Sequence, residues 1–225
     1  MDSFTQATLG AAVTVAVMHR HIAVWKAAVI GGGVAGTLPD LDVFIDHGDA
    51  ITNMLRHRAE THALFWLSLA SLPLAALAAR VTASFALWRR WWLALWLALV
   101  THPLLDVLTL YGTRLALPFS DHPFSIGSVF FVDPAVTTPW LVGVLVAVVS
   151  SRQAATLRAN RIGLAVGALY LGWTVAAQHF VLLQARASLA AAGIVAERTL
   201  ATPTAFNTLL WRVVAIDGNT MHEGC

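Results

Sequence analysis

The sequence predicts an all-α integral membrane bundle of five to six transmembrane helices, with a small extracytoplasmic appendage at the C-terminus. Of its 225 residues, 58% are hydrophobic and 12% are charged, whereas a soluble domain has about 45–50% apolar and about 25% charged residues. The apolar residues form runs that approach the roughly 20 residues needed to cross a bilayer. The basic residues gather in alternate connections between these runs, as they do in multi-pass membrane proteins.

Six apolar runs follow one another along the chain. The first two, residues 4–18 and 24–38, are short, so they form either a thin transmembrane hairpin or two interfacial helices. The glycines of "GGGVAG" at 31–36 favour close packing of the second run against a neighbouring helix, and Pro73 is expected to kink the third. The other four runs cover residues 63–79, 91–111, 135–150 and 162–181.

The distribution of charge predicts the orientation. With six spans, the three connections on one side carry basic residues and no acidic residue. Short loops rich in Lys and Arg remain in the cytoplasm, so the opposite side, with both termini and the carboxylates, is expected to face the periplasm from the bacterial inner membrane. The basic residues are Arg20, Lys26, Arg80, Arg89, Arg90, Arg152, Arg158 and Arg161.

The chain divides into an expected transmembrane domain, residues 1–181, and an expected appendage, residues 182–225. The segment "LLQARASLAAAG" indicates a short helix that ends at Gly193. The segments "IVAERTLA" (194–201) and "LLWRVVAID" (209–217) have the β-branched character of strands. A short helix is an alternative for the second of these segments.

Composition also limits the partners. A net charge of +2, spread thinly along the chain, argues against a nucleic-acid partner. The lone Cys225 allows no internal disulfide. The expected partners are the lipid bilayer and a small-molecule or lipid substrate, and the sequence does not indicate the oligomeric state.

An ionisable pair lies inside the fourth apolar run, in the segment "ALVTHPLLDVLT". His102 and Asp106 are four residues apart, which offsets them by about 40° around a helix, so both side chains point to the same side. An ionisable side chain in the bilayer costs roughly 2.5–3.5 kcal/mol on insertion scales. The pair is therefore a candidate functional site, and the alternative is a polar contact that packs two helices together.

Two further segments bring carboxylates and imidazoles to the same outer end of the bundle. Asp40 and Asp42 follow a proline and are expected in an extended turn. His57 and His62 are five residues apart, about 140° on a helix, so they cannot share a helical face. One of them is expected in the loop, with His62 at a helix start that has Thr61 as its N-cap.

Three carboxylates and three imidazoles at one end of a bundle suit a mononuclear or dinuclear metal site. This mixture of His and Asp favours Zn²⁺ first, with Mn or Fe as alternatives. Two ions bridged by a carboxylate also fit the Asp-rich set. The candidate ligands are Asp40, Asp42, His57, His62, His102 and Asp106.

Two charged residues between the predicted histidine ligands are candidate catalytic groups. Arg58 has the donors to hold an anionic substrate oxygen, and Glu60 has the chemistry of a general base. For each residue the alternative is a solvated loop charge.

The motifs "GTLPDLD", "HRAETHALF" and "THPLLDVLTLYGTRLALPFS" resemble those of the YdjM-like family of bacterial inner-membrane proteins, which are described as metal-dependent hydrolases. The resemblance extends over residues 2–134 and implies a metal-dependent hydrolase in the inner membrane. Two positions depart from the family pattern: Gln6 replaces a histidine found in some members, and Ala63 replaces a frequent serine. The positions that match the pattern are Gln6, Gly10, Asp40, Asp42, His57, Arg58, His62, His102, Asp106, Thr109, Gly112, Pro118 and Phe119.

Three functions are compatible with this pattern. The first is a hydrolase of a phosphoester or lipid-linked substrate, in which a divalent metal activates water. The second is a metal or proton transporter, for which polar residues through the full membrane depth are expected. The third is a membrane assembly protein with a structural metal. The inner halves of the predicted spans are nearly all apolar, which favours the first over the second.

Overall fold

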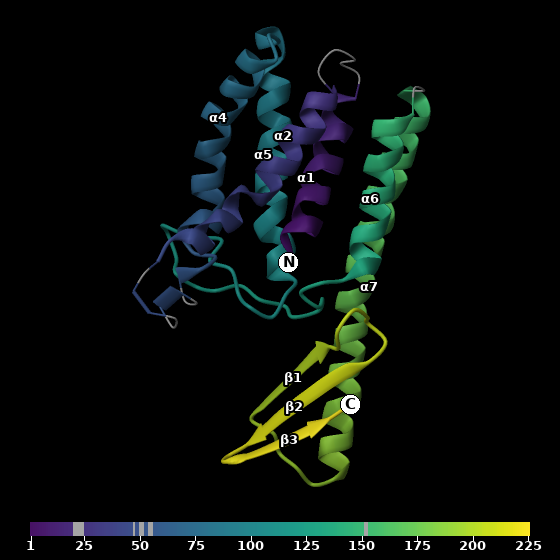
Figure 1. Cartoon of the computed structure of the whole chain (residues 1–225). Coiled ribbons are helices and arrows are strands. Elements are labelled where there is room, and N and C mark those ends of the chain that lie inside the picture. The colour runs from purple at the N-terminus through teal and green to yellow at the C-terminus, as the bar shows by residue number, and fades with distance from the viewer. Residues whose placement is uncertain (20–24, 47, 50–51, 54–55, 151–152) are drawn as a thin grey trace.

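The computed structural model describes residues 1–19, 25–46, 48–49, 52–53, 56–150 and 153–225. These residues form a helical bundle and a three-stranded sheet that lies beside the far end of the last helix (Figure 1). The helices are α1 (Ser3–Met18), α2 (Trp25–Thr37), α4 (Leu64–Val81), α5 (Trp88–Val107), α6 (Pro134–Val149) and α7 (Gln153–Ala191). The strands are β1 (Arg198–Pro203), β2 (Trp211–Asp217) and β3 (Thr220–Gly224), and short 3-10 helices are η1 (Leu38–Phe44), η2 (Glu60–His62) and η3 (Phe85–Leu87).

Each of the six apolar runs corresponds to one helix of the described chain. Among the described residues, three helical segments are long and apolar enough to cross a membrane: Trp25–Phe44, Leu64–Val81 and Leu157–Ala191. Helices α1 and α6 are apolar but shorter. The structure therefore supports a helical membrane protein, and the number of helices that cross the bilayer stays a prediction.

Helices α1 and α2 pack backbone against backbone, as the glycine run predicts. A Cβ atom added at Gly32 would overlap the Thr14 side chain, and one at Gly36 would overlap the Gln6 carbonyl. The Thr14 hydroxyl donates a hydrogen bond across the interface to the Ala28 carbonyl at 2.9 Å. This close approach brings the start of α1 and the end of α2 together, where the polar cluster described below is found.

Helix α5 packs against α1, α2 and α4. Its apolar face carries Trp91, Leu95 and Leu99, which are buried against Ala35 and Leu67 of the neighbouring helices. Beyond Leu99 the same helix continues into His102 and Asp106, both buried. The packing of α5 therefore holds these two polar side chains inside the bundle rather than against lipid.

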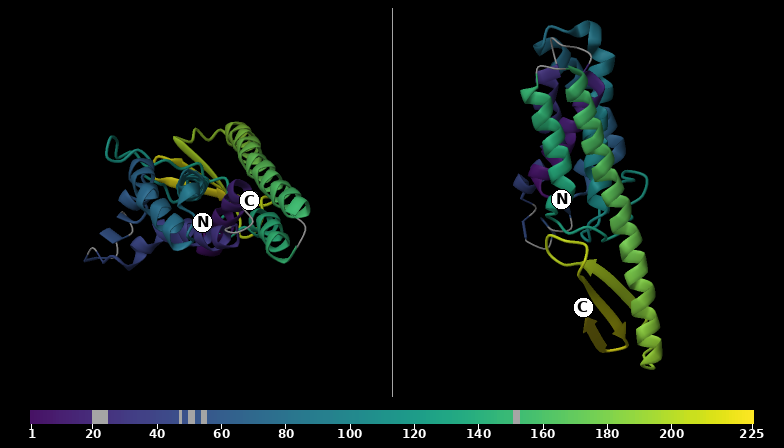
Figure 2. Two further views of the ribbon diagram at one scale, coloured as in Figure 1. Left: turned by 90° about the horizontal axis from the view of Figure 1, so that it is seen from above. Right: turned by 90° about the vertical axis from the view of Figure 1, so that its right-hand side faces the viewer.

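Helix α7 is a single helix of 39 residues. The run at 162–181 and the short helix expected at 182–193 are parts of this one element, so no break separates the predicted domains at residue 181. The helix ends just before Gly193, whose positive φ of 75° suits glycine. In Figure 2, right, α7 extends well past the rest of the bundle and carries the sheet at its far end.

The sheet is antiparallel in the order β1-β2-β3. Thr199 pairs with Ala215, and Ala215 pairs in turn with His222 of β3, a strand that the sequence pattern does not predict. The Gln178 amide of α7 donates to the carbonyls of Ile126 and Ala201 at 2.8 and 2.9 Å. These bonds connect α7 to both the bundle loops and the sheet.

The two ends of the bundle differ in charge. The α4–α5 connection lies at one end of the bundle, together with the end of α1, the start of α2, the end of α6 and the start of α7, and both termini lie toward the other end (Figure 1). Arg80, Arg89 and Arg90 flank the α4–α5 connection, and Arg158 is in the first turns of α7. Of the basic residues in the predicted inner connections, Arg20 and Arg152 lie outside the described residues.

Candidate metal centre

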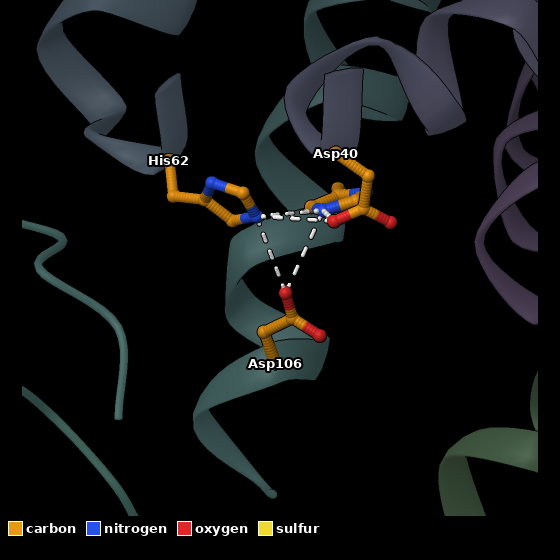
Figure 3. A group of neighbouring side chains, drawn as sticks. Asp40, His62 and Asp106 are labelled. Atoms are coloured by element: carbon orange, nitrogen blue, oxygen red, sulfur yellow. Dashed lines mark hydrogen bonds and ion pairs between the residues drawn. The ribbon is translucent and has the colours of Figure 1, made fainter. Parts of the chain in front are cut away.

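Four polar side chains from three segments meet at the end of the bundle opposite the basic connections. Asp40 comes from η1, His62 from η2, and His102 and Asp106 from α5. One potential ligand atom of each residue lies within 4.8 Å of the others. Figure 3 shows Asp40, His62 and Asp106 pointing toward one point from three directions. His62, His102 and Asp106 are buried, and Asp40 is half-buried.

Five of the six distances among the four donor atoms are close to those around a tetrahedral ion. The two Nε2 atoms of His62 and His102 are 3.0 Å apart. Asp40 Oδ1 lies 3.4 and 3.3 Å from these nitrogens, and Asp106 Oδ2 lies 3.4 and 3.5 Å from them. A tetrahedron with metal–ligand bonds of about 2.0–2.1 Å has edges of about 3.3–3.4 Å. The four donors are therefore close enough together to share a single cation of the size of Zn²⁺.

Hydrogen bonds orient both histidines so that Nε2 faces the cluster. His102 Nδ1 donates to the Gly36 carbonyl at 2.6 Å. His62 Nδ1 donates to the Thr61 hydroxyl at 2.9 Å, and that hydroxyl donates to Asp42 Oδ2 at 2.7 Å. In the neutral ring the proton is then on Nδ1, and the lone pair of Nε2 is free to bind a metal. Two lone pairs 3.0 Å apart require a proton or a cation between them.

Asp42 and His57 lie beside the four donors but form a pair of their own. His57 Nδ1 donates to Asp42 Oδ1 at 2.8 Å, and the Arg58 amide donates to Asp42 Oδ2 at 3.1 Å. The His57 and His62 ring centroids are 6.0 Å apart. In this arrangement Asp42 supports His62 through Thr61, and direct metal binding by Asp42 and His57 stays a prediction.

The local backbone explains why the two aspartates have different roles. The extended turn expected for them is instead the 3-10 helix η1. A 3-10 helix has 3.0 residues per turn, so residues two apart point about 120° away from each other. Asp40 therefore faces the histidine pair, while Asp42 faces the segment that carries His57 and Thr61.

Arg58 is buried at the centre, so the alternative of a solvated loop charge is excluded for it. Only 2% of its surface is exposed, and its φ of 64° is in the left-handed region. Its Nη1 donates to the Thr109 hydroxyl at 3.1 Å, and its Nε lies 3.4 Å from Asp106 Oδ2. The guanidinium also lies over the Tyr111 ring, 5.0 Å from its centroid.

Glu60 and Thr61 are the first two residues of η2, and neither caps the helix that follows. The N-cap of α4 is Ala63, with no side-chain cap bond, so the expected Thr61 cap is wrong. The Thr61 hydroxyl bonds Asp42 and His62 instead, because η2 separates it from the first turn of α4. Glu60 is exposed at the edge of the cluster, and its role as a general base stays a prediction.

Asp106 is held by the N-terminal segment as well. Its Oδ1 accepts hydrogen bonds from the Met1 amine and from Gln6 Nε2, the latter at 3.2 Å. Among the described residues, three buried atoms around it have no hydrogen-bond partner: Asp106 Oδ2, Arg58 Nε and Gln6 Oε1. Buried polar atoms normally have partners, so their clustering here marks a place for a polar ligand or an ion.

The carboxylates also change the protonation of His62. Burial alone would lower the pKa of its imidazole, but the neighbouring carboxylates of Asp106, Asp40 and Asp42 together outweigh burial, and the pKa is raised. A proton at Nε2 competes with a cation for the same position. The metal-free cluster is therefore prepared to hold positive charge.

Sequence reasoning from the charged residues alone misses three supporting groups. The Gly36 carbonyl orients His102, but a main-chain acceptor leaves no signal in a sequence. Thr109 binds Arg58, and Thr61 joins His62 to Asp42. Both threonines lie within the "HRAETH" and "HPLLDVLT" segments, so their position beside the predicted ligands is the signal that points to them.

Apolar helices around a buried Asp–His cluster define a class: integral membrane proteins with a potential metal-binding centre. The model of the YdjM inner membrane protein family matches residues 1–181, and the chain belongs to this family. The match includes every residue of the cluster and confirms the family resemblance of the motifs. No curated protein and no solved structure matches the chain.

Proposed function

We propose that the protein is a membrane-bound, divalent-metal-dependent hydrolase that acts at the outer face of the inner membrane on a phosphoester or lipid-linked substrate. The observation that carries this proposal is the convergence of two imidazole nitrogens and two carboxylate oxygens within 4.8 Å of one another in a buried cluster. Membership of an inner-membrane family and the apolar helices support the location. The basic connections at the opposite end support the outward orientation.

Asp40, His62, His102 and Asp106 would hold the ion, with Zn²⁺ the best fit to the donor types and spacing. A bound divalent metal lowers the pKa of water and polarises the phosphoryl or carbonyl oxygen under attack. The set contains nitrogen and oxygen donors and no thiolate, whereas structural zinc sites are usually rich in Cys. A hydrolase also needs a position for water at the ion, which water would take by adding to the four side chains or by replacing one of them.

The surrounding residues have roles that follow from their contacts. The Gly36 carbonyl and the Thr61–Asp42 chain keep both Nε2 atoms directed at the ion. Arg58 places an unpartnered Nε–H beside Asp106 Oδ2, where it would hold an anionic oxygen of the substrate. Burial of this guanidinium strengthens its attraction for an anion because the local dielectric is low.

The transporter alternative has less support. The buried carboxylates of the described chain are Asp42, Asp106 and Asp133, and all three lie toward the same end of the bundle. A transport path requires polar groups through the membrane depth. A cluster confined to one end is better suited to a reaction at the membrane surface.

The first test is metal analysis of the protein purified in detergent. Wild type is expected to contain close to one equivalent of Zn²⁺, and His102→Ala is expected to lose it while the protein still inserts in the membrane. His179→Ala is the matched control, because His179 is an exposed histidine of α7 outside the cluster. Wild type that binds no divalent metal would refute the proposal.

The second test is hydrolysis of a panel of water-soluble phosphoesters and phospholipids. Activity is expected in wild type and in His179→Ala and is expected to disappear in His102→Ala. Substitution with Co²⁺ provides a separate measurement, since its visible spectrum distinguishes four- from five-coordinate sites. A metal-loaded protein that stays strictly four-coordinate and hydrolyses nothing would favour a structural metal instead.

A further inference from the structure

A long apolar groove extends from residues next to the candidate metal centre into the membrane-spanning part of the bundle. Two adjacent hollows, of about 350 and 410 Å³, make up this groove, and Leu38 and Leu74 line both of them. Helix α5 forms its floor through Trp91, Leu95 and Leu99. Helices α2 and α4 form its two walls.

The walls follow one face of each helix. On α4 the lining residues run from Trp66 to Val81, which is about 22 Å at 1.5 Å per residue. On α2 they recur at helical spacing from Ala27 to Ala35, and Leu38 of η1 continues the same wall. Gly31 keeps the groove open: a Cβ there would face Trp91 and Leu95 at ordinary contact distances of 3.7 and 3.9 Å, so a larger side chain would extend into the space.

The outer end of the groove reaches the residues that carry the cluster. Its lining there includes Pro39, Glu60 and Thr61. Pro39 precedes the ligand Asp40, and Thr61 precedes and hydrogen-bonds the ligand His62. A molecule in the groove with a polar end at Pro39 and Thr61 therefore has that end beside the metal centre and the rest of its length on apolar walls.

The surroundings of the groove favour a hydrocarbon chain as its occupant. The walls belong to segments long and apolar enough to span a membrane, so the medium around the groove is lipid. Its length also exceeds the roughly 15 Å of one bilayer leaflet.

We propose that the groove between α2 and α4 holds the hydrocarbon chain of an amphiphilic substrate, with the polar head and its scissile ester bond at the metal centre. The chemistry assigned to the polar head of the substrate rests on the proposed hydrolase function. The place assigned to its hydrocarbon chain rests on the groove alone. The substrate class is thus a lipid phosphate or phosphodiester that enters from the bilayer with one long chain between the two helices.

The test uses hexadecyl phosphate with a diazirine near the end of its chain, photolysed with the full-length protein in phosphatidylcholine vesicles. Mass spectrometry is expected to place the label mainly on residues of α2 and α4 that line the groove. Gly31→Phe, which fills the groove, is expected to reduce this labelling about tenfold or more. Gly172→Phe is the matched control, because a Cβ at Gly172 meets no atom within 4 Å.

Retained metal content and a monodisperse elution profile verify that the Gly31→Phe variant is folded. Ala78→Phe, on the opposite wall of the groove, is a second variant that is expected to reduce the labelling in the same way. Label spread evenly over all lipid-facing helices, or unchanged in both groove variants, overturns the proposal. If the groove is labelled but the protein binds no metal and hydrolyses nothing, the chain-binding proposal is supported and the hydrolase proposal is refuted. If the protein hydrolyses soluble phosphoesters but the groove is not labelled, the hydrolase proposal is supported and the chain-binding proposal is refuted.

Discussion

At the scale of single residues, the candidate site depends on how protons are distributed over its hydrogen bonds. The acceptors that face His102 and His62 fix the imidazole proton on Nδ1, so both Nε2 lone pairs point at the same position. Asp42 ends one of these chains and accepts from three donors: His57, Thr61 and the Arg58 amide. A carboxylate that supports a ligand in this way tunes metal affinity without contacting the metal.

Asp42→Asn is therefore expected to weaken metal binding by about 10- to 100-fold. An amide cannot accept from all three donors, because one of its two oxygens becomes an NH₂ group. Competition with a fluorescent zinc chelator measures the affinity. Asp121→Asn, at an exposed carboxylate paired with Arg114, is the control and should have the wild-type affinity. Unchanged affinity in Asp42→Asn would remove Asp42 from the support of the site.

Arg58→Lys is expected to keep the metal and to lower kcat/KM for an anionic substrate by about 10- to 100-fold, the range expected when a hydrogen bond to a charged group is lost. Lysine keeps the charge but cannot place a planar fork of donors beside Asp106 and Thr109 together. Metal content and kinetics are measured on the same preparation, with Arg198→Lys in the exposed part of β1 as the control. Loss of metal in Arg58→Lys would show that the arginine has a structural role.

At the scale of elements, the α1–α2 interface determines how close the ligand-bearing segments come. Gly32 and Gly36 allow contact between the two backbones. Gly36 then presents its carbonyl to His102, while Gln6 from α1 reaches Asp106. The glycine run predicts that α2 packs closely against another helix. Only the three-dimensional arrangement shows that this helix is α1 and that Gly36 orients the ligand His102.

A pair of substitutions tests this interface within one helix. Gly32→Ala is expected to destabilise the protein by about 1–3 kcal/mol, because the new methyl overlaps Thr14 in a packed contact. Gly33→Ala should be close to neutral, since its Cβ would lie 3.7 Å from the nearest atom, the Ala7 carbonyl oxygen. Thermal unfolding in detergent, followed by tryptophan fluorescence, measures both. Equal stability of the two variants would contradict backbone-to-backbone packing of α1 and α2.

At the scale of the whole molecule, charge is divided between two ends. The cluster, both termini and the sheet lie toward one end, and the connections with Arg80, Arg89 and Arg90 lie at the other (Figure 1). The energy of moving basic loops across the membrane favours their retention in the cytoplasm. This division is the basis of the prediction that the candidate metal centre faces the periplasm.

Labelling of single cysteines in intact spheroplasts tests the orientation. The exposed native Cys225 is expected to react with a membrane-impermeant maleimide. In a Cys225→Ser background, cysteines at Phe85 and Ala155 should react only after permeabilisation, because both positions flank the basic connections. Reaction of either position in intact cells would reverse the orientation and place the cluster on the cytoplasmic side.

The sequence by itself determined the membrane class, the helices and the charged residues that matter, because these depend on local composition and on the periodicity of apolar runs. The pair His102 and Asp106 was recognisable for the same reason, since four residues on one helix fix a shared face. Local patterns also predicted Gly193 as the end of a helix, and the glycine packing of α2. Helix α7 was divided wrongly at residue 181, because a change from apolar to polar composition does not by itself end a helix.

Only the tertiary structure decided which candidate ligands meet. Asp40 and Asp42 are equivalent in the sequence, but the 3-10 geometry of η1 turns one toward the histidine pair and the other toward Thr61. The sequence around Arg58 is typical of a solvated loop, yet the left-handed backbone at Arg58 directs its side chain into the buried cluster. The physical reason is that the site lies where irregular segments cross regular helices. Its geometry depends on long-range hydrogen bonds and on φ and ψ angles that no local residue pattern encodes.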